Sequence, residues 1–295
     1  MSTAILKIVP VRPTNQGERA GMEVRMTYVD ELQTLPALPL SALRILEMIE
    51  DPNTSTADLA RVVETDPILS AQAMRLANSA YNGMDGAVSS AGRAVVLLGF
   101  TTVRALATAA VCGLIGSHQD NVQRGFWPHA IAVALGASVV ARRTAVPPGD
   151  AFSAGLVHDL GALLLQRRHG DAYKRVVDLS VRDNAGLLSR EWKAFGTTHT
   201  EVTAEVLRDF NLPAAFVRAM EDHHVPLAQA TQPLTKVLIA GEALAREFEN
   251  VAPHEPVAPL RAVLGEVGLE RVAHKELLDE MRREALVLGR FLKIQ

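Results

Sequence analysis

Cysteine is almost absent from this chain of 295 residues, because Cys112 is the only one. A disulfide framework is therefore excluded, and a reducing compartment, the cytoplasm, is the expected location. Aromatic side chains are also scarce, at 4% of the residues, and alanine, leucine and valine dominate in their place. This composition, with glycine and proline mostly between periodic apolar segments, predicts a nearly all-α protein.

The chain has no strong excess of charge of either sign, since its formal net charge is −3. It therefore has no global basic field to attract nucleic acid, and DNA is not expected as a partner. The longest apolar stretch, Ala105 to Gly116, is too short to span a bilayer. Lys7 and Pro10 break the apolar run at the N-terminus, which makes it a poor signal peptide. We expect a soluble protein that is not bound to a membrane, and the sequence contains no Gly-rich phosphate loop.

The periodic segments predict how the chain is organised. Residues 1–30 have no clear helical period and are expected to form a flexible N-terminal segment, with a short pair of strands as the alternative. The helical body, residues 31–250, divides into an N-terminal helical part (31–118) and a second helical part (119–250). Residues 251–295 are expected to form C-terminal helices that pack on the second part.

Local signals predict where several helices begin. Each signal is an N-cap side chain or a proline in the first turn. They occur at Ser55, Asp66-Pro67, Pro128, Asp150 and Thr198-x-x-Glu201, the last being a capping-box pattern. The helix that starts at Asp150 is expected to carry the dipeptide His158-Asp159.

Six polar or charged residues lie in apolar helical surroundings: His129, His158, Asp159, His199, His223 and His224. Burying such groups is costly unless they are paired, hydrogen-bonded or bound to a metal. A single core histidine usually just bonds a carbonyl or a carboxylate. Here, however, separate helices direct imidazole or carboxylate groups at one core, which favours a shared polar site. Imidazole and carboxylate are ligands of transition metals, so this site is a candidate metal centre. Without a metal, Asp159 would need a buried hydrogen-bond network.

Six segments, in this order, resemble the HDOD domain family over roughly residues 30–250. They are LPALPLSALRILEMIEDPNTSTADLARVVETDPILSAQAMRLANSA, AVVLLGFTTVRAL, FWPHAIAVA, AFSAGLVHDLGALLL, TTHTEVTAEVLRDFNLP and AMEDHH. The resemblance implies an all-α, HD-domain-like helical bundle, residues 119–250, with an additional N-terminal helical subdomain, residues 31–118.

The resemblance also implies roles for the polar residues, because HDOD domains are related to the HD phosphohydrolases. Those enzymes hold divalent metal with a histidine, a His-Asp pair and a later aspartate. Carried over by motif, His129 is the first ligand and His158 and Asp159 are the pair. His199, His223 and His224 match extra histidine ligands of the HD-GYP phosphodiesterases, which cleave cyclic di-GMP. The implied cofactor is a divalent metal, with Fe, Mn, Ni and Zn as candidates.

The chain departs from the HD pattern at the final aspartate. The corresponding segment reads KVLIAGEAL, and Gly241 stands where the aspartate is expected. Glu242 is one residue further on, about 100° around a helix, and is therefore a doubtful substitute. The missing carboxylate removes negative charge that a divalent cation needs, and it removes the usual partner of a nucleophilic water.

The resemblance and this departure together predict a bacterial cytoplasmic signal-transduction module without phosphodiesterase activity. Such a module acts through contacts with regulatory proteins, and a cyclic dinucleotide is a further candidate ligand. Two alternatives remain open. One is a metal-dependent phosphohydrolase of the HD superfamily, and the other is a pseudoenzyme that senses a metal or a nucleotide.

Overall fold

The computed structural model describes residues 28, 29, 31, 39–49, 51–80, 88–111, 123–183, 186–249 and 259–291. All regular structure in these residues is helical, which confirms the predicted all-α fold. The expected flexible segment, residues 1–30, lies outside the described residues except for Tyr28 and Val29. None of the helices in the described part of the chain is long and apolar enough to cross a membrane.

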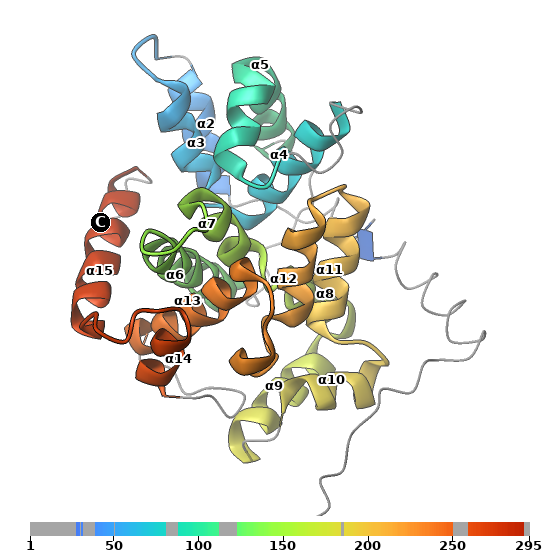
Figure 1. The fold of residues 1–295 in the computed structure, drawn as a ribbon. Coiled ribbons are helices and arrows are strands. Elements are labelled where there is room, and N and C mark those ends of the chain that lie inside the picture. Colours follow the sequence, from blue (N-terminus) through green and yellow to red (C-terminus); the bar gives the residue numbers. More distant parts are fainter. Residues whose placement is uncertain are drawn as a thin grey trace, which may run out of the picture.

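Figure 1 shows α2 to α5 gathered at one end of the molecule. These helices are α2 (Pro39–Ile49), α3 (Thr56–Val63), α4 (Pro67–Ala80) and α5 (Ala91–Val111). α5 packs against the other three and is kinked at Gly99, where φ is 70°. Two predicted helix starts are confirmed here. Ser55 caps α3 in a capping box, and the Asp66 carboxylate accepts the backbone N–H groups of Ile68 and Leu69 at 2.9 and 3.1 Å.

Glu64 lies between α3 and the start of α5, where its carboxylate accepts the backbone N–H of Gly92. Burial raises the pKa of Glu64 to about 6 despite this bond. Ionised Glu64 therefore lowers the free energy of unfolding above about pH 6, and this loss disappears below about pH 4.5, where the carboxyl is protonated in both states. Because 1.4 kcal/mol corresponds to one pKa unit, Glu64→Gln should stabilise the protein by about 1–2 kcal/mol at pH 8. Urea unfolding at pH 8 and pH 4.5 measures this, with exposed Glu266→Gln as the control. Equal effects at both pH values would contradict the assignment.

Three helices of the second half of the chain meet at glycines and form its centre. They are α6 (Gln123–Ala141), α7 (Pro148–Val157) and α13 (Pro233–Glu249), and α6 packs against both of the others. A Cβ added at Gly155 would lie 2.7 Å from the backbone of Ala134 in α6. A Cβ added at Gly241 would lie 2.4 Å from the backbone nitrogen of Ala137. Both crossings therefore depend on the absence of a side chain.

The remaining helices flank this centre. They are α8 (Leu160–His169), α9 (Asp171–Asp183), α10 (Leu187–Phe195), α11 (His199–Asp209), α12 (Ala214–Asp222), α14 (Leu260–Glu266) and α15 (His274–Phe291). A short 3-10 helix, η1 (Leu227–Gln229), follows α12. α11 packs on α8 and α12, whereas α9 and α10 form a hairpin at the edge of the molecule (Figure 1).

The C-terminal helix α15 packs along α6, where ion pairs join the two helices. Arg142 donates to Glu280 at 2.7 Å and also pairs with Glu284. Arg143 donates to Glu280 at 2.8 Å and to Glu276 at 3.2 Å. This end of α6 is therefore tied to residues far along the chain.

Two predicted helix starts are wrong. α6 begins at Gln123, so Pro128 lies inside the helix, where it removes one backbone donor without ending it. α7 begins at Pro148 with Pro147 as its N-cap, so Asp150 lies in the first turn and does not cap the helix. Prolines set the start of α7 through their fixed φ, and this signal outweighs the acidic residue that follows.

Candidate metal centre

The six predicted site residues lie together, although they come from four separate regions of the chain. His129 is near the start of α6, His199 is the first residue of α11, and His223 is the C-cap of α12, followed by His224. His158 and Asp159 do not lie within one helix as expected. His158 is the C-cap of α7 and Asp159 is the N-cap of α8, so the pair occupies a break between the two helices.

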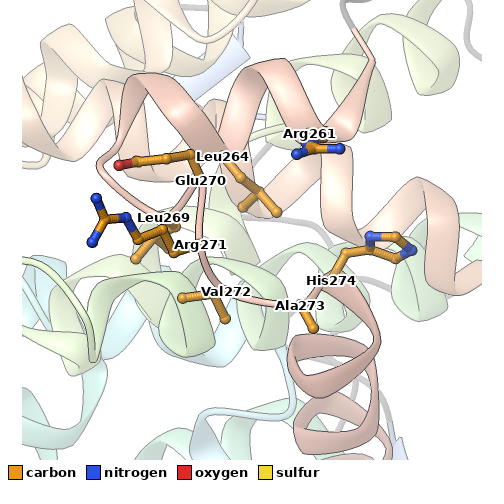
Figure 2. Close-up of a pocket in the computed structure, with 8 residues that line it drawn as sticks. All are labelled: Arg261, Leu264, Leu269, Glu270, Arg271, Val272, Ala273 and His274. Carbon is orange, nitrogen blue, oxygen red and sulfur yellow. The ribbon is translucent and has the colours of Figure 1, made fainter.

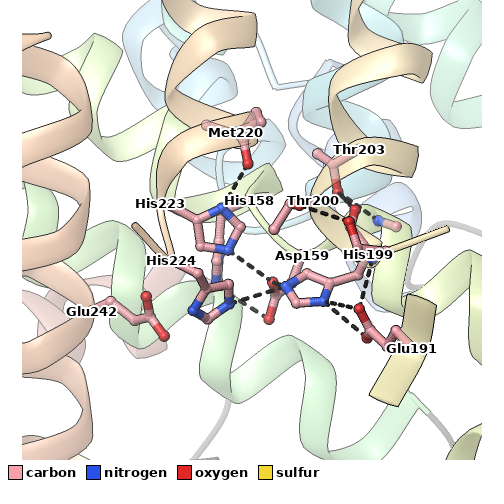
Figure 3. Close-up of polar contacts among 12 residues, drawn as sticks. His158, Asp159, Glu191, His199, Thr200, Thr203, Met220, His223, His224 and Glu242 are labelled. Carbon is pink, nitrogen blue, oxygen red and sulfur yellow. Dashed lines mark hydrogen bonds and ion pairs between the residues drawn. The ribbon is translucent and has the colours of Figure 1, made fainter. Parts of the chain in front are cut away.

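These residues form two overlapping sets of potential metal ligands. One set is Asp159, His199, His223 and His224, and the other is His129, His158 and Asp159. Within each set the ligand atoms all lie within 4.8 Å of one another. Asp159 belongs to both sets, and Figure 3 shows its carboxylate among the histidine rings.

The outer nitrogens of four rings are held by acceptors of the protein. His158 Nδ1 bonds the carbonyl of Gly155 at 2.8 Å, and His223 Nδ1 bonds the carbonyl of Met220 at 2.8 Å. His199 Nδ1 lies 2.8 Å from a Glu191 oxygen, and His129 Nδ1 lies 2.9 Å from a Glu249 oxygen. A carbonyl or carboxylate accepts a hydrogen bond from a protonated Nδ1. Each bond therefore leaves the Nε2 lone pair free to bind a metal.

The atoms at the centre of the site lack such partners. Nε2 of His158, Nε2 of His223 and Oδ1 of Asp159 are buried and have no hydrogen-bond partner among the described residues, although His158 Nε2 lies 3.3 Å from Oδ2 of Asp159. Asp159 Oδ1 lies 3.4 Å from His199 Nε2 and 3.5 Å from His223 Nε2. A tetrahedral ion with bonds of about 2.1 Å separates its ligand atoms by about 3.4 Å. These spacings and the donor types fit a divalent metal.

The charges of the site also favour a cation. Burial would raise the pKa of Asp159, but the imidazoles of His158, His223 and His199 hold it well below its ordinary value. Burial opposes protonation of His199, but the carboxylates of Glu191, Asp159 and Glu242 outweigh it and raise the pKa of His199 to about 9. Buried carboxylates thus surround the rings, and they would favour any cation placed between them.

The close crossing of α8 and α11 sets the position of His199. A Cβ at Gly161 in α8 would lie 2.1 Å from the carbonyl oxygen of His199, so only glycine allows this approach. Thr203 completes the contact, because its hydroxyl donates to the same carbonyl at 2.9 Å and accepts the N–H of Gly161 at 2.8 Å. The predicted capping box of Thr198 and Glu201 is confirmed and starts α11 directly before His199.

Gly241 does not face the site, whereas Glu242 lies at its edge. Gly241 lies against Ala137 in the crossing of α6 and α13. Glu242 is buried, and Figure 3 shows its carboxylate beside the ring of His224. Burial would raise its pKa, but its ion pair with Arg246 and the nearby histidines lower it to about 2. The site therefore has a second carboxylate at its edge.

Nothing in the sequence pointed to Glu191 and Glu249 as partners of the histidines. Glu191 lies in a charged amphipathic segment, and Glu249 is the last residue of α13. Their roles depend on contacts between separate helices, and Glu249 is 120 residues from His129. In the sequence, Glu191 is one of several charged residues in a polar segment. Only the structure shows that its carboxylate is buried.

A cavity of about 310 Å³ lies elsewhere, between α14 and the start of α15 (Figure 2). Its lining includes Arg261, Arg271 and His274, all of which are exposed. None of the six site residues lines it. The chemistry predicted from the sequence therefore belongs to the histidine cluster and not to this cavity.

Comparison with known proteins places the chain in a family. The family model of the HDOD domain matches residues 35–226. An uncharacterized protein of Treponema pallidum (strain Nichols) is 22% identical over 235 residues, which cover 78% of this chain. The chain spans about half of that relative, 46% of its length.

Solved structures show the same fold. The MmoQ response regulator of Methylococcus capsulatus str. Bath is 26% identical, with a TM-score of 0.68, 83% of this chain covered and 98% of that chain. A virulence factor of Campylobacter jejuni is 16% identical, with a TM-score of 0.66, 90% of this chain covered and 99% of that one. The family match extends over most of the chain and includes all six predicted site residues. The chain belongs to the HDOD domain family.

Proposed function

We propose that this protein is a bacterial cytoplasmic signalling module that binds a divalent metal and acts through contacts with regulatory proteins, without phosphodiesterase turnover. Membership of the HDOD family supports the signalling role, and so does the similarity to a protein described as a response regulator. The metal is supported by one observation above all. Buried ligand atoms of His158, Asp159 and His223 face one another without a hydrogen-bond partner in the part of the chain that the structure describes.

The metal would be held by Asp159 together with histidines from both ligand sets. His199, His223 and His224 would bind it on one side of the carboxylate, and His129 and His158 on the other. A bound divalent ion supplies a positive charge that satisfies the buried atoms and fixes four separate regions of the chain relative to one another. In a signalling module, that charge would serve structure or sensing.

The absence of turnover is proposed from the surroundings of the site. Arg246 pairs with the Glu242 carboxylate and neutralises the charge that a catalytic site would use on a water or a metal. The side chains of His158, His199 and His223 are each no more than 2% exposed, so a phosphodiester would have to approach through Asp159, His129 and His224, which are only partly exposed, at 22% for Asp159 and 29% for His129. Access of this kind suits a small ion better than a dinucleotide.

A metal-dependent phosphohydrolase is the second candidate, because Glu242 faces the site. It supplies a carboxylate near the place where the HD pattern requires one, in spite of the glycine at position 241. If Arg246 moved away, this carboxylate could orient a water beside the histidines.

One experiment separates the two functions. The purified protein would be analysed for bound Fe, Mn, Ni and Zn, and then assayed with cyclic di-GMP and a generic phosphodiester. We expect stoichiometric metal and no turnover. Metal-dependent turnover that disappears in Asp159→Ala would establish the phosphohydrolase. Binding of cyclic di-GMP without hydrolysis would instead identify the dinucleotide as a sensed ligand.

A further inference from the structure

Glu191 is a fully buried carboxylate on α10, outside the helices that carry the metal ligands. One of its oxygens accepts a hydrogen bond from the hydroxyl of Tyr173 at 2.7 Å. The other accepts the backbone N–H of His199 at 2.9 Å, and the same oxygen lies 2.8 Å from His199 Nδ1. The carboxylate therefore contacts the main chain and the ring of one residue at the same time.

This double contact fixes more than the position of α11. The bond to the backbone N–H holds the first residue of the helix, as an N-terminal acceptor does. The bond to Nδ1 fixes the rotation of the imidazole and the nitrogen that carries the proton. The opposite nitrogen, Nε2, then faces Asp159 at 3.4 Å and His224 Nε2 at 3.0 Å. A neutral acceptor in place of the Glu191 carboxylate could hold the start of α11. The carboxylate also places negative charge beside Nδ1, which makes Nε2 of His199 a stronger metal ligand.

His199 is unlike the other buried rings in this respect. His158 and His223 bond backbone carbonyls that belong to their own helical turns, so their orientation is set locally. His199 depends on a side chain from α10, which Tyr173 of α9 orients in turn. The α9–α10 hairpin thus supplies an anchor that the helices carrying the ligands do not provide.

We propose that Glu191 is a positioning residue of the metal centre, acting through His199 and oriented by Tyr173. This inference rests on the proposed metal binding. Glu191 would therefore contribute to metal affinity as well as to the packing of α10 against α11.

The test is a titration of metal-free protein with Zn²⁺ against a competing chelator. Glu191→Gln keeps the shape of the side chain. Its amide oxygen can accept both N–H groups of His199, while its NH₂ donates to the hydroxyl of Tyr173. The negative charge of the carboxylate beside Nδ1 is lost, so Zn²⁺ affinity should fall about 10- to 100-fold. The matched control is Glu201→Gln, which weakens the capping box of the same helix without touching the ring of His199. It should alter the melting temperature and leave Zn²⁺ affinity within about 3-fold, since no ligand contact changes.

A second measurement uses the wild-type protein and does not depend on a variant that folds. In the Zn²⁺-loaded protein, NMR should show a downfield, slowly exchanging Nδ1 proton on His199, held by the Glu191 carboxylate. Coordination through Nδ1 would remove that proton and overturn the proposal. Equal Zn²⁺ affinities for wild type and Glu191→Gln, or equal losses in Glu191→Gln and Glu201→Gln, would also overturn it. A wild-type protein that binds no Zn²⁺ would contradict the proposed function itself.

Discussion

Replacing Gly241 with aspartate, which restores the residue that the HD pattern expects, should destabilise the protein by about 3 kcal/mol or more and should not improve metal binding. The new Cβ would lie 2.4 Å from the backbone nitrogen and 2.5 Å from the Cα of Ala137. These are main-chain atoms, so the contact can be relieved only by separating α6 from α13. The carboxylate would also be buried in that crossing, away from the cation it is meant to bind.

Urea unfolding measures the loss, and Gly241→Ala separates its two causes. Alanine introduces the steric clash without the charge, so it should account for most of the effect, about 2–3 kcal/mol. Gly265→Ala is the control, because the nearest atom to its Cβ is a side-chain carbon at 3.8 Å. It should be neutral or slightly stabilising. A Gly241→Asp protein that melts like the wild type and binds metal more tightly would show that α13 can turn its other face to the site.

Asp159→Asn should abolish metal binding, with a loss of affinity of at least about 100-fold, because both ligand sets share this carboxylate. Asparagine has the same shape but no charge to offer a cation. The metal-free protein should also lose about 1–3 kcal/mol near pH 7. The pKa of Asp159 is held well below its ordinary value, so the stability it contributes is present above about pH 4 and is lost as the pH falls.

Metal titration and urea unfolding at pH 7 and pH 3 check this prediction. Asp209→Asn, an exposed change at the end of α11, is the control and should alter neither quantity. Undiminished metal binding by Asp159→Asn would mean that the histidines bind metal without the carboxylate. A stability loss that persists at acid pH would mean that Asp159 acts through its shape and not through its charge.

Local signals in the sequence predicted much of the fold and the six members of the site. The caps at Ser55, Asp66 and Thr198 are formed by residues close in sequence, so their patterns can be read directly. The site could be expected because polar residues inside apolar helices need partners, and the structure places those residues together.

Features that depend on how helices cross could not be predicted. Which of Gly241 and Glu242 faces the site depends on the rotation of α13, and the crossing at Ala137 decides it. Glu191 becomes a partner of His199 only when α10 folds back against α11. Pro128 looked like a helix start, because a proline within a helix and one at its start differ only in whether the preceding residues continue the helix.

The most direct test of the account is anomalous diffraction from crystals of the protein loaded with Zn²⁺ or Mn²⁺. We predict a metal peak about 2.0–2.2 Å from Asp159 Oδ1 and from Nε2 of His199 and His223. Glu191 should remain on the opposite side of the His199 ring. Density in which these rings enclose only water or pack against one another, at saturating metal, would contradict the claim that the site binds metal.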